Sequence, residues 1–584
     1  MTQEANLAPY GVEYTKRVVV REAEARLYER YTTDADHHFV TFIDYMGGDA
    51  VIERVATAGH GVGIFKEHPE RHDFFKHLVA KSLFAPFKSV LFRFHVQSSI
   101  ADALHIVYDP RSSVNEYSGR YSVMIDTAFI PSVAYLVHQT DDPQLSEQVH
   151  HLIHTSRVAN YERYESLVSG DVDLARELAR TPLELNNDTA FFWKIDLYSL
   201  IRFIAEKRAL IGSKPNSLHP YLNRFEAIAR AVAPFGTDVL FGDSTEGELA
   251  LDQPNGDSII DPTPLPPTWE PQRTKRLVVP EAEAVLFRPC AYLAHGAIQL
   301  TDYMGGDLTP AETARISYGV GTTRVSQDKH LIRYLLRHRH TTPFEHPEFS
   351  VEGKVPVFVD PRQAGRHRTL DTHCFMGQTL VGSDYFVPDK GELKFQDRLN
   401  RQGRGEELPE SLRHQVIESL KESFQAQLDL ADTLRELNVD EGIVQGIKGV
   451  GFYTFQYRTG DLHNWLHFLG LRLDAHAQEE IRAYAQICAG FLERLFPTAY
   501  KGFQDYFIKA VTFTQDELKF LSDLAGDALE GFDFDNPRAY PRKFSMQVRG
   551  GDSGAKKRRR FNRIGNELRA KLEHLLVLRM DGEN

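Results

Sequence analysis

The chain has few cysteines and lacks a long apolar run. Its 584 residues include three cysteines, Cys290, Cys374 and Cys488, which are too few for a disulfide framework and indicate a reducing compartment. No stretch of 18 or more apolar residues occurs, so we expect no membrane-spanning helix. The segment Met1–Asn6 is not a charged stretch followed by an apolar one. We therefore expect no secretory signal and a cytoplasmic protein.

Positive charge is also in deficit. The formal net charge of −13 argues against a general nucleic-acid-binding protein. With 42% hydrophobic and 26% charged residues, the composition is that of an ordinary globular protein. The length predicts about two to four domains, because a single core rarely grows this large.

The chain repeats itself. Thr15-Lys-Arg-Val-Val-Val-Arg-Glu-Ala-Glu-Ala returns as Thr274-Lys-Arg-Leu-Val-Val-Pro-Glu-Ala-Glu-Ala, 259 residues later. Asp44-Tyr-Met-Gly-Gly-Asp49 returns unchanged from Asp302 to Asp307, 258 residues later. Two matches at almost the same offset predict two tandem domains.

The composition between and after the repeats marks the expected boundaries. The proline-rich stretch Asp261–Pro271 is typical of an extended linker. Lys556-Lys-Arg-Arg-Arg560 begins a basic helical pattern, which we interpret as a solvated face, with nucleic-acid contact as the alternative. We predict a first repeat at 1–245, a linker at 246–272, a second repeat at 273–520 and a C-terminal helical extension at 521–584.

Each repeat predicts an α+β fold. Short β-branched runs at Lys16–Val20 and Val355–Val359 predict strands. Apolar residues at three- and four-residue spacing predict long helices over Val416–Leu437 and Ala475–Leu495. Strands and helices are therefore mixed in both copies.

Two short segments concentrate polar chemistry. Ser113, Asn115, Glu116, Ser118 and Arg120 surround Gly119, which allows a ligand to approach the backbone closely, so the segment could hold a phosphate. A polar loop that satisfies its own backbone is the alternative. The triplet Arg366-His367-Arg368 offers two guanidinium groups suited to phosphate or pyrophosphate, with a surface ion-pair patch as the alternative.

A third segment runs from Asp461 to Gln478. His463 and His467 are four residues apart and share a helical face, but this pair without a metalloprotease glutamate does not predict a metal site. Arg472 lies two turns beyond Asn464 and could present a cation to an anionic group. No base pattern accompanies the cysteines, so a thiolate nucleophile is not expected.

Together these segments resemble the flavin-dependent thymidylate synthases, whose signature is Arg-His-Arg-x-x-Ser-x-Asn-x-x-Ser-x-Arg-Tyr. The second repeat matches its beginning at Arg366-His367-Arg368 and then departs from it, with Asp371, His373, Met376 and Gln378 at the Ser, Asn, Ser and Arg positions. The first repeat has Tyr108-Asp109-Pro110 at the beginning and keeps Ser113, Asn115, Ser118, Arg120 and Tyr121. Each repeat thus keeps the half that the other has lost.

Further family motifs divide in the same way. The pattern Thr/Ser-Pro-Phe-Glu-His is present at Thr342–His346 and altered at Ala85–Ser89. The distal Leu-Arg-x-Asp-x-His-Ala-Gln pattern is present at Leu471–Gln478 and absent from the first repeat. An Ala-Arg pair of the family is kept at Ala179-Arg180, whereas Gln445 stands at the arginine position in the second repeat.

The resemblance implies a composite active site and a role for each retained residue. Cofactor contacts are expected from Thr342, Arg366, His367, Arg368, Asp461, His463 and His467, with Glu116 from the first repeat. Substrate contacts are expected from Gln363, Arg366, Glu116, Ser118, Gly119, Arg120, Arg180 and Arg472, and Arg472 is the expected catalytic residue because it would stabilise charge on the uracil ring. The expected assembly is a homodimer in which four repeats imitate a tetramer, with its site within one chain or across two.

The implied reaction is methylation of dUMP to dTMP. Methylenetetrahydrofolate would supply the carbon and NADPH-reduced FAD the hydride. The alternatives are a flavin enzyme that modifies another pyrimidine nucleotide, and a non-catalytic protein that binds flavin or nucleotide.

Overall fold

The computed structural model forms two units, Met1–Ile508 and Lys509–Asn584; the first contains the first repeat and the second repeat as far as Ile508, short of the predicted boundary at 520. The described residues are 13–33, 37–57, 71–120, 122–169, 173–212, 216–242, 271–316, 325–359, 383–396, 404–511, 513–515, 517–519 and 521. The motif residues Gln363, Arg366, His367 and Arg368, almost all of the expected linker and nearly all of the C-terminal extension lie outside these ranges.

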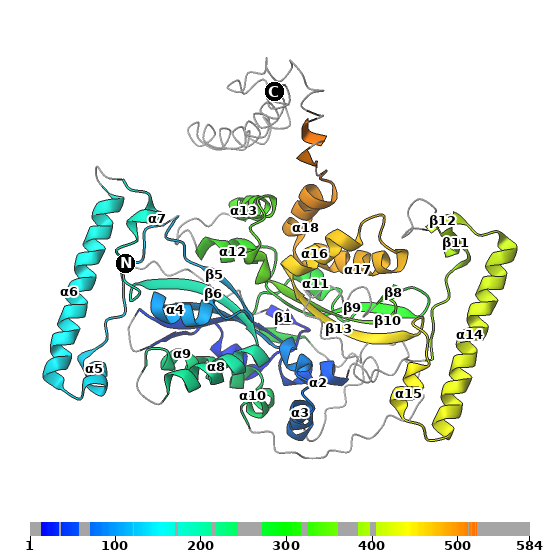
Figure 1. The fold of residues 1–584 in the computed structure, drawn as a ribbon, viewed down its shortest axis with the longest axis horizontal. Coiled ribbons are helices and arrows are strands. Elements are labelled where there is room, and N and C mark those ends of the chain that lie inside the picture. Colours follow the sequence, from blue (N-terminus) through cyan, green and yellow to red (C-terminus); the bar gives the residue numbers. More distant parts are fainter. Residues whose placement is uncertain are drawn as a thin grey trace. The chain divides into compact units, whose positions relative to one another are not determined.

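Helices and strands alternate irregularly along each repeat (Figure 1). The first repeat contains β1 (Glu13–Thr15), α1 (Arg21–Arg26), β2 (Arg30–Thr32), β3 (Phe39–Met46), α2 (Asp49–Thr57), α3 (Arg71–Ala80), the 3-10 turn η2 (Ala85–Ser89), β4 (Leu91–Ser99), α4 (Ile100–Val107), β5 (Ser112–Glu116), α5 (Val133–Thr140), α6 (Pro143–Val168), α7 (Arg176–Ala179), β6 (Asp188–Asp196), α8 (Leu197–Ile211), α9 (His219–Val232) and α10 (Pro234–Phe241).

The second repeat follows the same plan. It contains β7 (Gln272–Thr274), α11 (Pro280–Glu283), β8 (Cys290–Tyr292), β9 (Gly296–Met304), α12 (Thr309–Arg315), α13 (Val325–Arg337), the 3-10 turn η4 (Thr342–Glu345), β10 (Glu348–Pro356), η5 (Lys390–Glu392), β11 (Lys394–Gln396), β12 (Arg404–Glu407), α14 (Glu410–Glu436), α15 (Glu441–Gly446), β13 (Tyr453–Asp461), α16 (Leu462–Arg472), α17 (Glu479–Leu495), α18 (Pro497–Phe503) and a π-helical turn, η6 (Gln504–Ile508).

Each repeat is built on an antiparallel sheet. The strand order is β2-β3-β4-β6-β5 in the first and β8-β9-β10-β13 in the second. A bulge interrupts the register at Ile43 in β3 and at Thr301 in β9, which are equivalent positions. Because a bulge redirects the residue beside it, it accounts for the matching placement of Asp44 and Asp302 at the junction between the repeats.

The central strands are buried on both faces. Every residue of β3, β10 and β13 is buried, although these strands belong to antiparallel sheets. Helices α8 and α9 pack against the first sheet, with α10 packed against both of them, and α16 and α17 pack against the second sheet (Figure 1). The other faces meet the opposite repeat, where Met46, Leu91 and Met304 form a shared apolar cluster.

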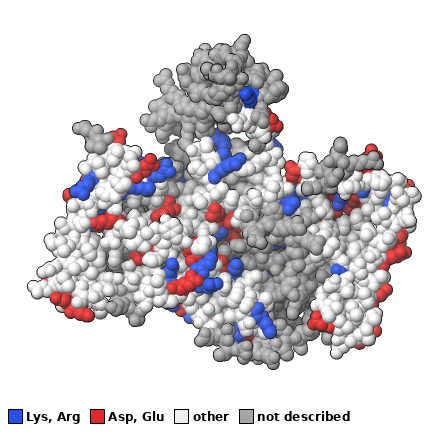
Figure 2. All heavy atoms as spheres, in the orientation of Figure 1, with Lys and Arg blue, Asp and Glu red and all other residues white. Residues whose placement is uncertain are grey.

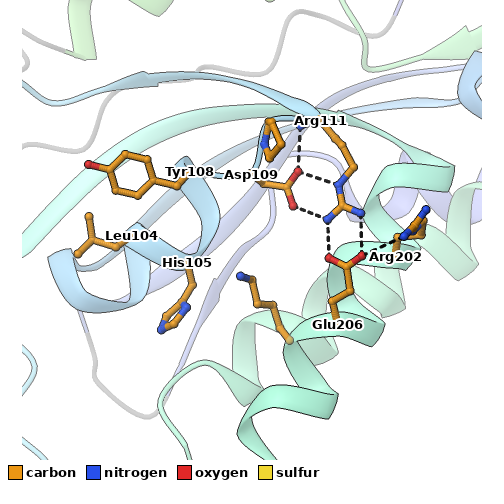
Figure 3. Close-up of a pocket in the computed structure, with 9 residues that line it drawn as sticks. Leu104, His105, Tyr108, Asp109, Arg111, Arg202 and Glu206 are labelled. Atoms are coloured by element: carbon orange, nitrogen blue, oxygen red, sulfur yellow. Dashed lines mark hydrogen bonds and ion pairs between the residues drawn. The ribbon is translucent and has the colours of Figure 1, made fainter.

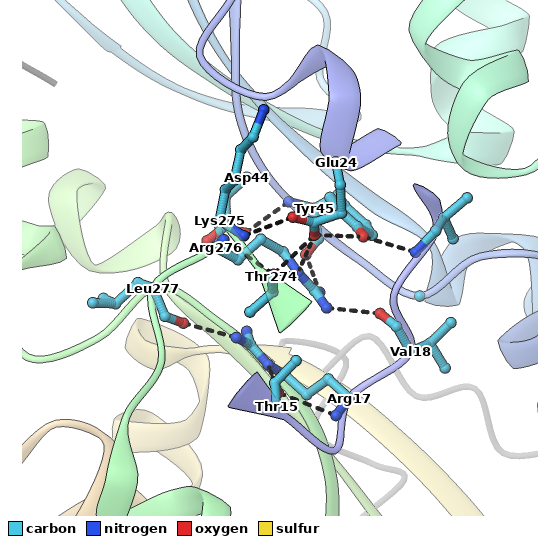
Figure 4. A network of polar contacts seen from close by, with 12 residues as sticks. Thr15, Arg17, Val18, Glu24, Asp44, Tyr45, Thr274, Lys275, Arg276 and Leu277 are labelled. Carbon is cyan, nitrogen blue, oxygen red and sulfur yellow. Dashed lines mark hydrogen bonds and ion pairs between the residues drawn. The ribbon is translucent and has the colours of Figure 1, made fainter. Parts of the chain in front are cut away.

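Two buried arginines join the repeats through reciprocal contacts (Figure 4). Arg17 donates to the carbonyl of Tyr303 at 2.9 Å, and Arg276 donates to the carbonyl of Tyr45 at 3.1 Å. Each guanidinium also lies over the ring whose carbonyl it contacts, at 3.9 and 4.2 Å from the two centroids. The arginines occupy equivalent positions in the sequence repeat, so the two domains are related by an approximate two-fold axis.

Two carboxylates beside the arginines, Asp44 and Asp302, follow the same two-fold symmetry. Asp44 Oδ2 accepts a 3.1 Å hydrogen bond from Gly305 N, and Asp302 Oδ2 accepts one of 3.1 Å from Gly47 N. Burial raises the pKa of both carboxyls, while the charges of Arg276 and Arg17 oppose the shift. Gly47 and Gly305 have φ of +83° and +74°, so glycine supplies the backbone conformation that delivers these donors.

The structure corrects two sequence predictions of strands. Lys16–Val20 is not a strand; β1 ends at Thr15, and the next residues carry Arg17 into the interface between the repeats. The strand predicted at Val355–Val359 ends at Pro356, the last residue of β10, because Pro356 pairs with Tyr453, the first residue of the partner strand β13.

The helix predictions are closer. Val416–Leu437 corresponds to α14, and Ala475–Leu495 to α17. Helix α17 begins four residues later than predicted, because Asp474 binds the backbone amide of His476 at 2.8 Å and closes a turn before it.

The described surface is mixed in charge. On the face shown in Figure 2, lysines and arginines lie interspersed with aspartates and glutamates. Among the described helices, none combines the length and apolar character that crossing a membrane requires.

Candidate active site

The two repeats meet where strand β5 lies against the 3-10 turn η4. The side chain of Asn115, in β5, donates to the carbonyl of Thr313 at 2.7 Å and accepts from Thr342 Oγ1 at 3.1 Å. Strand β5 is an edge strand, so one of its sides is open to this contact. In η4, Pro343 and Phe344 are buried and anchor the turn, which leaves Thr342 at the boundary.

An acidic side chain of the same turn reaches the first repeat. Glu345 is hydrogen-bonded to Ser113 of β5. Burial raises the pKa of Glu345, and the charge of Lys194 and the bond to Ser113 oppose that shift. Residues of the first repeat's signature segment thus touch the second repeat's Thr342–His346 motif within one chain.

A buried ammonium group faces several carboxylates beside this contact. Lys194, in β6 of the first repeat, forms an ion pair with Glu348 and lies 3.9 Å from Asp461 Oδ2. Burial raises the pKa of Asp461 well above its usual range; Lys194 opposes the shift, and Glu348 and Glu345 add to it. Lys194 is therefore the nearby cation that offsets a cluster of three acids.

A neutral imidazole completes the boundary. His346 is fully buried, and its pKa is lowered well below the ordinary value by burial and by the charges of Arg93 and Lys194. The ring of Phe192 meets it edge-on at 6.4 Å between centroids. Arg93 also donates to Thr313 Oγ1 at 2.9 Å, so the first repeat supplies both cations near His346.

The loop after β5 gathers the residues expected to hold a nucleotide. Thr189 Oγ1 donates to Glu116 Oε1 at 2.7 Å. Burial raises the pKa of Glu116, while that bond and the charge of Arg180 oppose the rise. A Cβ atom on Gly119 would lie 2.4 Å from Met124 Sδ and 3.4 Å from Arg180 Nη1, so no larger residue fits beside Arg180 without a shift.

Arg120 is placed at the rim of this loop. It is exposed and forms an ion pair of 3.1 Å with Glu177, which is also exposed. The backbone amide of Arg120 donates to Ser118 Oγ at 3.4 Å. An exposed ion pair is weak, so Arg120 can exchange this partner for an anionic ligand at little cost.

Helix α16 carries the remaining predicted residues of the second repeat. Asp461 caps it by accepting from Asn464 N at 2.8 Å. His463 and His467 share a face of the helix, as predicted, and burial together with His467 lowers the pKa of His463. Arg472 is the last residue of α16, about 16 Å along its axis from Asp461.

Figure 3 shows a pocket in the first repeat at the position of its altered motif. The cavity of about 410 Å³ is lined by Leu104, His105, Tyr108, Asp109, Pro110, Arg111, Arg202, Glu206 and Lys207. Tyr108-Asp109-Pro110 replaces the Arg-His-Arg of the family signature. Helices α8 and α16 each follow an aspartate cap, so Arg202 corresponds to His467 and Lys207 to Arg472.

An ion-pair network crosses this pocket. Arg111 Nη2 contacts Asp109 Oδ2 at 2.6 Å and Glu206 Oε2 at 2.8 Å (Figure 3). Burial acts to raise the pKa of Asp109, but its bonds to Arg111 prevail and hold that pKa below the usual range. The guanidinium of Arg111 is therefore already paired with Asp109 and Glu206, two carboxylates that line the same pocket.

The cysteines do not supply a nucleophile at this boundary. Burial raises the pKa of Cys488 to about 12, and it also raises the pKa of Cys290. Both thiols are accordingly protonated at neutral pH. Cys374 lies outside the described residues.

The sequence alone does not predict Lys194, Glu348, Glu345, His346 or Arg93 as individual site residues. Glu345 and His346 belong to the Thr342–His346 motif, so the sequence does contain a signal for them. Lys194 and Glu348 had a weaker signal, a single charge within or beside an apolar strand. Their pairing joins positions 154 residues apart, which local sequence patterns do not reveal.

The comparisons with known proteins agree with the duplicated architecture. The family model described as "Thymidylate synthase complementing protein" matches residues 41–210 and 299–498. A flavin-dependent thymidylate synthase of Wolbachia pipientis wMel is 36% identical over 258 residues, covering 43% of this chain and 89% of the relative. The enzyme of that name from Gluconobacter oxydans (strain 621H) is 38% identical over 267 residues, covering 44% of this chain and 87% of the relative.

A solved structure is also similar to part of this chain. The UMP/dUMP methylase PolB from Streptomyces cacaoi bound with 5-Br UMP is 25% identical, with a TM-score of 0.33, and the match covers 36% of this chain and 95% of that one.

Two copies of one domain, facing each other across an approximate two-fold axis, define a duplicated α+β protein. Because the family model matches both copies, the chain belongs to the flavin-dependent thymidylate synthase family.

Proposed function

We propose that this chain methylates dUMP to dTMP at a single composite site built from both of its repeats. Methylenetetrahydrofolate is the carbon donor, and FAD, reduced by NADPH, supplies the hydride. The observation that carries the proposal is the contact of Asn115 with Thr342, which unites the retained halves of the family's motifs.

The first repeat binds the nucleotide. Arg120 and Arg180 clamp the dUMP phosphate, and Gly119 lets that phosphate approach the backbone. Arg120 leaves its exposed partner Glu177 for the phosphate, while Glu116, with Ser118 beside it, is held in place by its bond from Thr189. This clamp fixes the distance between the uracil ring and the cofactor.

The second repeat positions the uracil ring and the flavin. Arg472 stabilises the negative charge that develops on the ring, and Gln363 binds its polar edge. Thr342, Asp461, His463 and His467 join Arg366, His367 and Arg368 in contacting the flavin nucleotide.

The internal repeat supports this flavin set. In the first repeat, the altered motif and helix α8 line one pocket, in which Asp109 engages Arg111. The equivalent second-repeat positions carry Arg366, His367 and Arg368 from the motif, with no acid among them. That set fits an anionic ligand such as the pyrophosphate of FAD.

The assembly is a homodimer in which four repeats surround the axis. Helix α6 has 26 residues and α14 has 27, yet the buried residues are three in the former and one, Ala431, in the latter. Leu152, on α6, is 68% exposed, and Leu430, on α14, is 47% exposed. Long helices with such little burial and exposed apolar residues favour cover by a second copy. Light scattering should therefore give twice the chain mass of 66.5 kDa.

The central test counts flavin and measures turnover. Purified protein should hold about one FAD per chain, and it should oxidise NADPH and form dTMP only when dUMP and methylenetetrahydrofolate are present. A protein that takes up no flavin would overturn both enzyme readings. A protein that binds flavin but ignores dUMP would instead be a flavin enzyme acting on another pyrimidine nucleotide.

A second test locates the site within one chain. Arg120→Ala and Arg366→Ala should each abolish turnover, and mixed dimers of the two variants should stay inactive. Chains carrying different affinity tags verify that the dimers have exchanged. Restored activity in verified mixed dimers would show that the site is shared between chains.

A further inference from the structure

Two histidines and an aspartate lie close together near the loop after β5, which is expected to hold the nucleotide. His37 and His38 precede β3, and Asp188 is the first residue of β6. His38 Nε2 lies 2.7 Å from Asp188 Oδ1, and His37 Nε2 lies 3.2 Å from Asp188 Oδ2. One ligand atom from each residue lies within 4.8 Å of the other two.

We propose that His37, His38 and Asp188 bind a zinc ion. Two imidazoles and one carboxylate form a donor set that zinc uses, with bonds of about 2.0–2.2 Å that leave ligand atoms a few ångströms apart. The Asp188 and His38 side chains are almost completely buried, whereas the His37 side chain is 31% exposed. Solvent water can therefore reach the fourth coordination position.

Neighbouring groups orient these ligands as metal sites require. Thr127 Oγ1 donates to Asp188 Oδ2 at 2.6 Å, which fixes the carboxylate. The ring of His38 stacks on Phe129 at 5.9 Å between centroids, which fixes the imidazole plane. Such outer contacts hold metal ligands in one geometry.

The site is specific to the repeat that keeps the nucleotide loop. The second-repeat position equivalent to Asp188 is Tyr453, the first residue of β13, whose hydroxyl cannot replace a carboxylate in this set. In the first repeat, Thr189 follows Asp188 and donates to Glu116 of the loop. A zinc ion bound to Asp188 would thus hold the start of β6 in place, and with it the Thr189 hydroxyl that positions Glu116. This consequence rests on the proposed function, whereas zinc binding itself does not.

The test measures zinc directly on the full chain. Protein expressed with zinc and then dialysed should contain about one zinc ion per chain by inductively coupled plasma mass spectrometry. His37→Gln should lose this zinc, and the partial exposure of His37 makes unfolding of that variant a small risk. The control His77→Gln, on α3 and half-buried, should keep it.

A second readout uses cobalt and thermal stability. Chelator-treated wild-type protein given Co²⁺ should show the visible absorption of a four-coordinate ion, and zinc should raise its melting temperature. His37→Gln should show neither response. Equal zinc in wild type and His37→Gln, or no zinc in wild type, overturns the proposal. Because neither readout uses dUMP or flavin, the result is independent of the proposed reaction.

Discussion

Thr342 Oγ1 donates a 3.1 Å hydrogen bond to Asn115 Oδ1 across the boundary between the repeats. The other end of the Asn115 amide donates to the carbonyl of Thr313 at 2.7 Å. A single buried side chain of the first repeat thus connects two elements of the second, the helix α12 and the turn η4.

Asn115→Ala should impair the site more than the fold. Losing one buried and one partly buried hydrogen bond lowers the free energy of unfolding by about 1–3 kcal/mol. We expect kcat/KM for dUMP to fall by about 10–100-fold, because the two halves of the site lose their alignment. Steady-state kinetics and urea unfolding measure the two effects. Asn223→Ala, at an exposed position, is the matched control, and an equal loss of activity in both variants would contradict the alignment role.

Asp109 should matter for stability and not for flavin binding. Asp109→Asn weakens the bonds to Arg111 and should cost about 1.5–3 kcal/mol, the usual range for a hydrogen bond to a charged group. The FAD content per chain should stay that of the wild type, because the flavin contacts belong to the second repeat. Arg366→Ala should lose the flavin absorbance. Loss of flavin in Asp109→Asn would assign a cofactor to the first-repeat pocket.

A partly buried histidine, His95 in β4, makes the fold sensitive to acid. Burial, with the charges of Arg30 and Arg93, lowers the pKa of His95 to about 4. The unfolded chain binds a proton near pH 6.5 and the folded chain does not, so this contribution to stability is complete above pH 6.5 and is lost as the pH falls toward 4. The loss attributable to His95 is about 3 kcal/mol, at about 1.4 kcal/mol for each pKa unit.

Urea unfolding at a series of pH values tests this dependence. His95→Phe suits a site already lined by Phe39 and Phe192, whose rings lie 5.1 and 4.9 Å from the imidazole. The variant should lose about one proton of the pH dependence between pH 6.5 and 4. An unchanged slope would show that His95 is protonated in the folded protein.

The sequence predicted the duplication, the mixed helices and strands and the division of motifs, because these depend on local patterns and on matches at a fixed offset. It did not predict the role of Arg17. A cation in the β-branched run Lys16–Val20 reads as an exposed position in a strand, whereas the structure buries it against Tyr303 of the other repeat. Only the paired arrangement of the domains supplies the carbonyl groups that make that burial favourable.

Lys194 presents the same difficulty at the candidate site. No sequence pattern in β6 predicts a partner for Lys194. The equivalent position in the second repeat is Thr459. The position equivalent to Glu348 in the first repeat is Leu91. Lys194 therefore occurs only in the first repeat and Glu348 only in the second, so two copies of the same repeat could not form this ion pair. This charge complementarity favours pairing of unlike repeats.

Exchanging the residues between the copies tests this interpretation. Lys194→Thr alone leaves Glu348 and Asp461 without their buried cation, so it should lower the free energy of unfolding by about 3–5 kcal/mol. The double variant Lys194→Thr/Glu348→Leu should recover most of that loss, because it removes the carboxylate that pairs directly with Lys194 and follows the pattern of the equivalent positions. A double-mutant cycle in urea gives the coupling energy, which we expect to exceed about 1 kcal/mol. Simple addition of the two single effects would mean that the pair does not couple the repeats, and the charge complementarity would then have no role in holding them together.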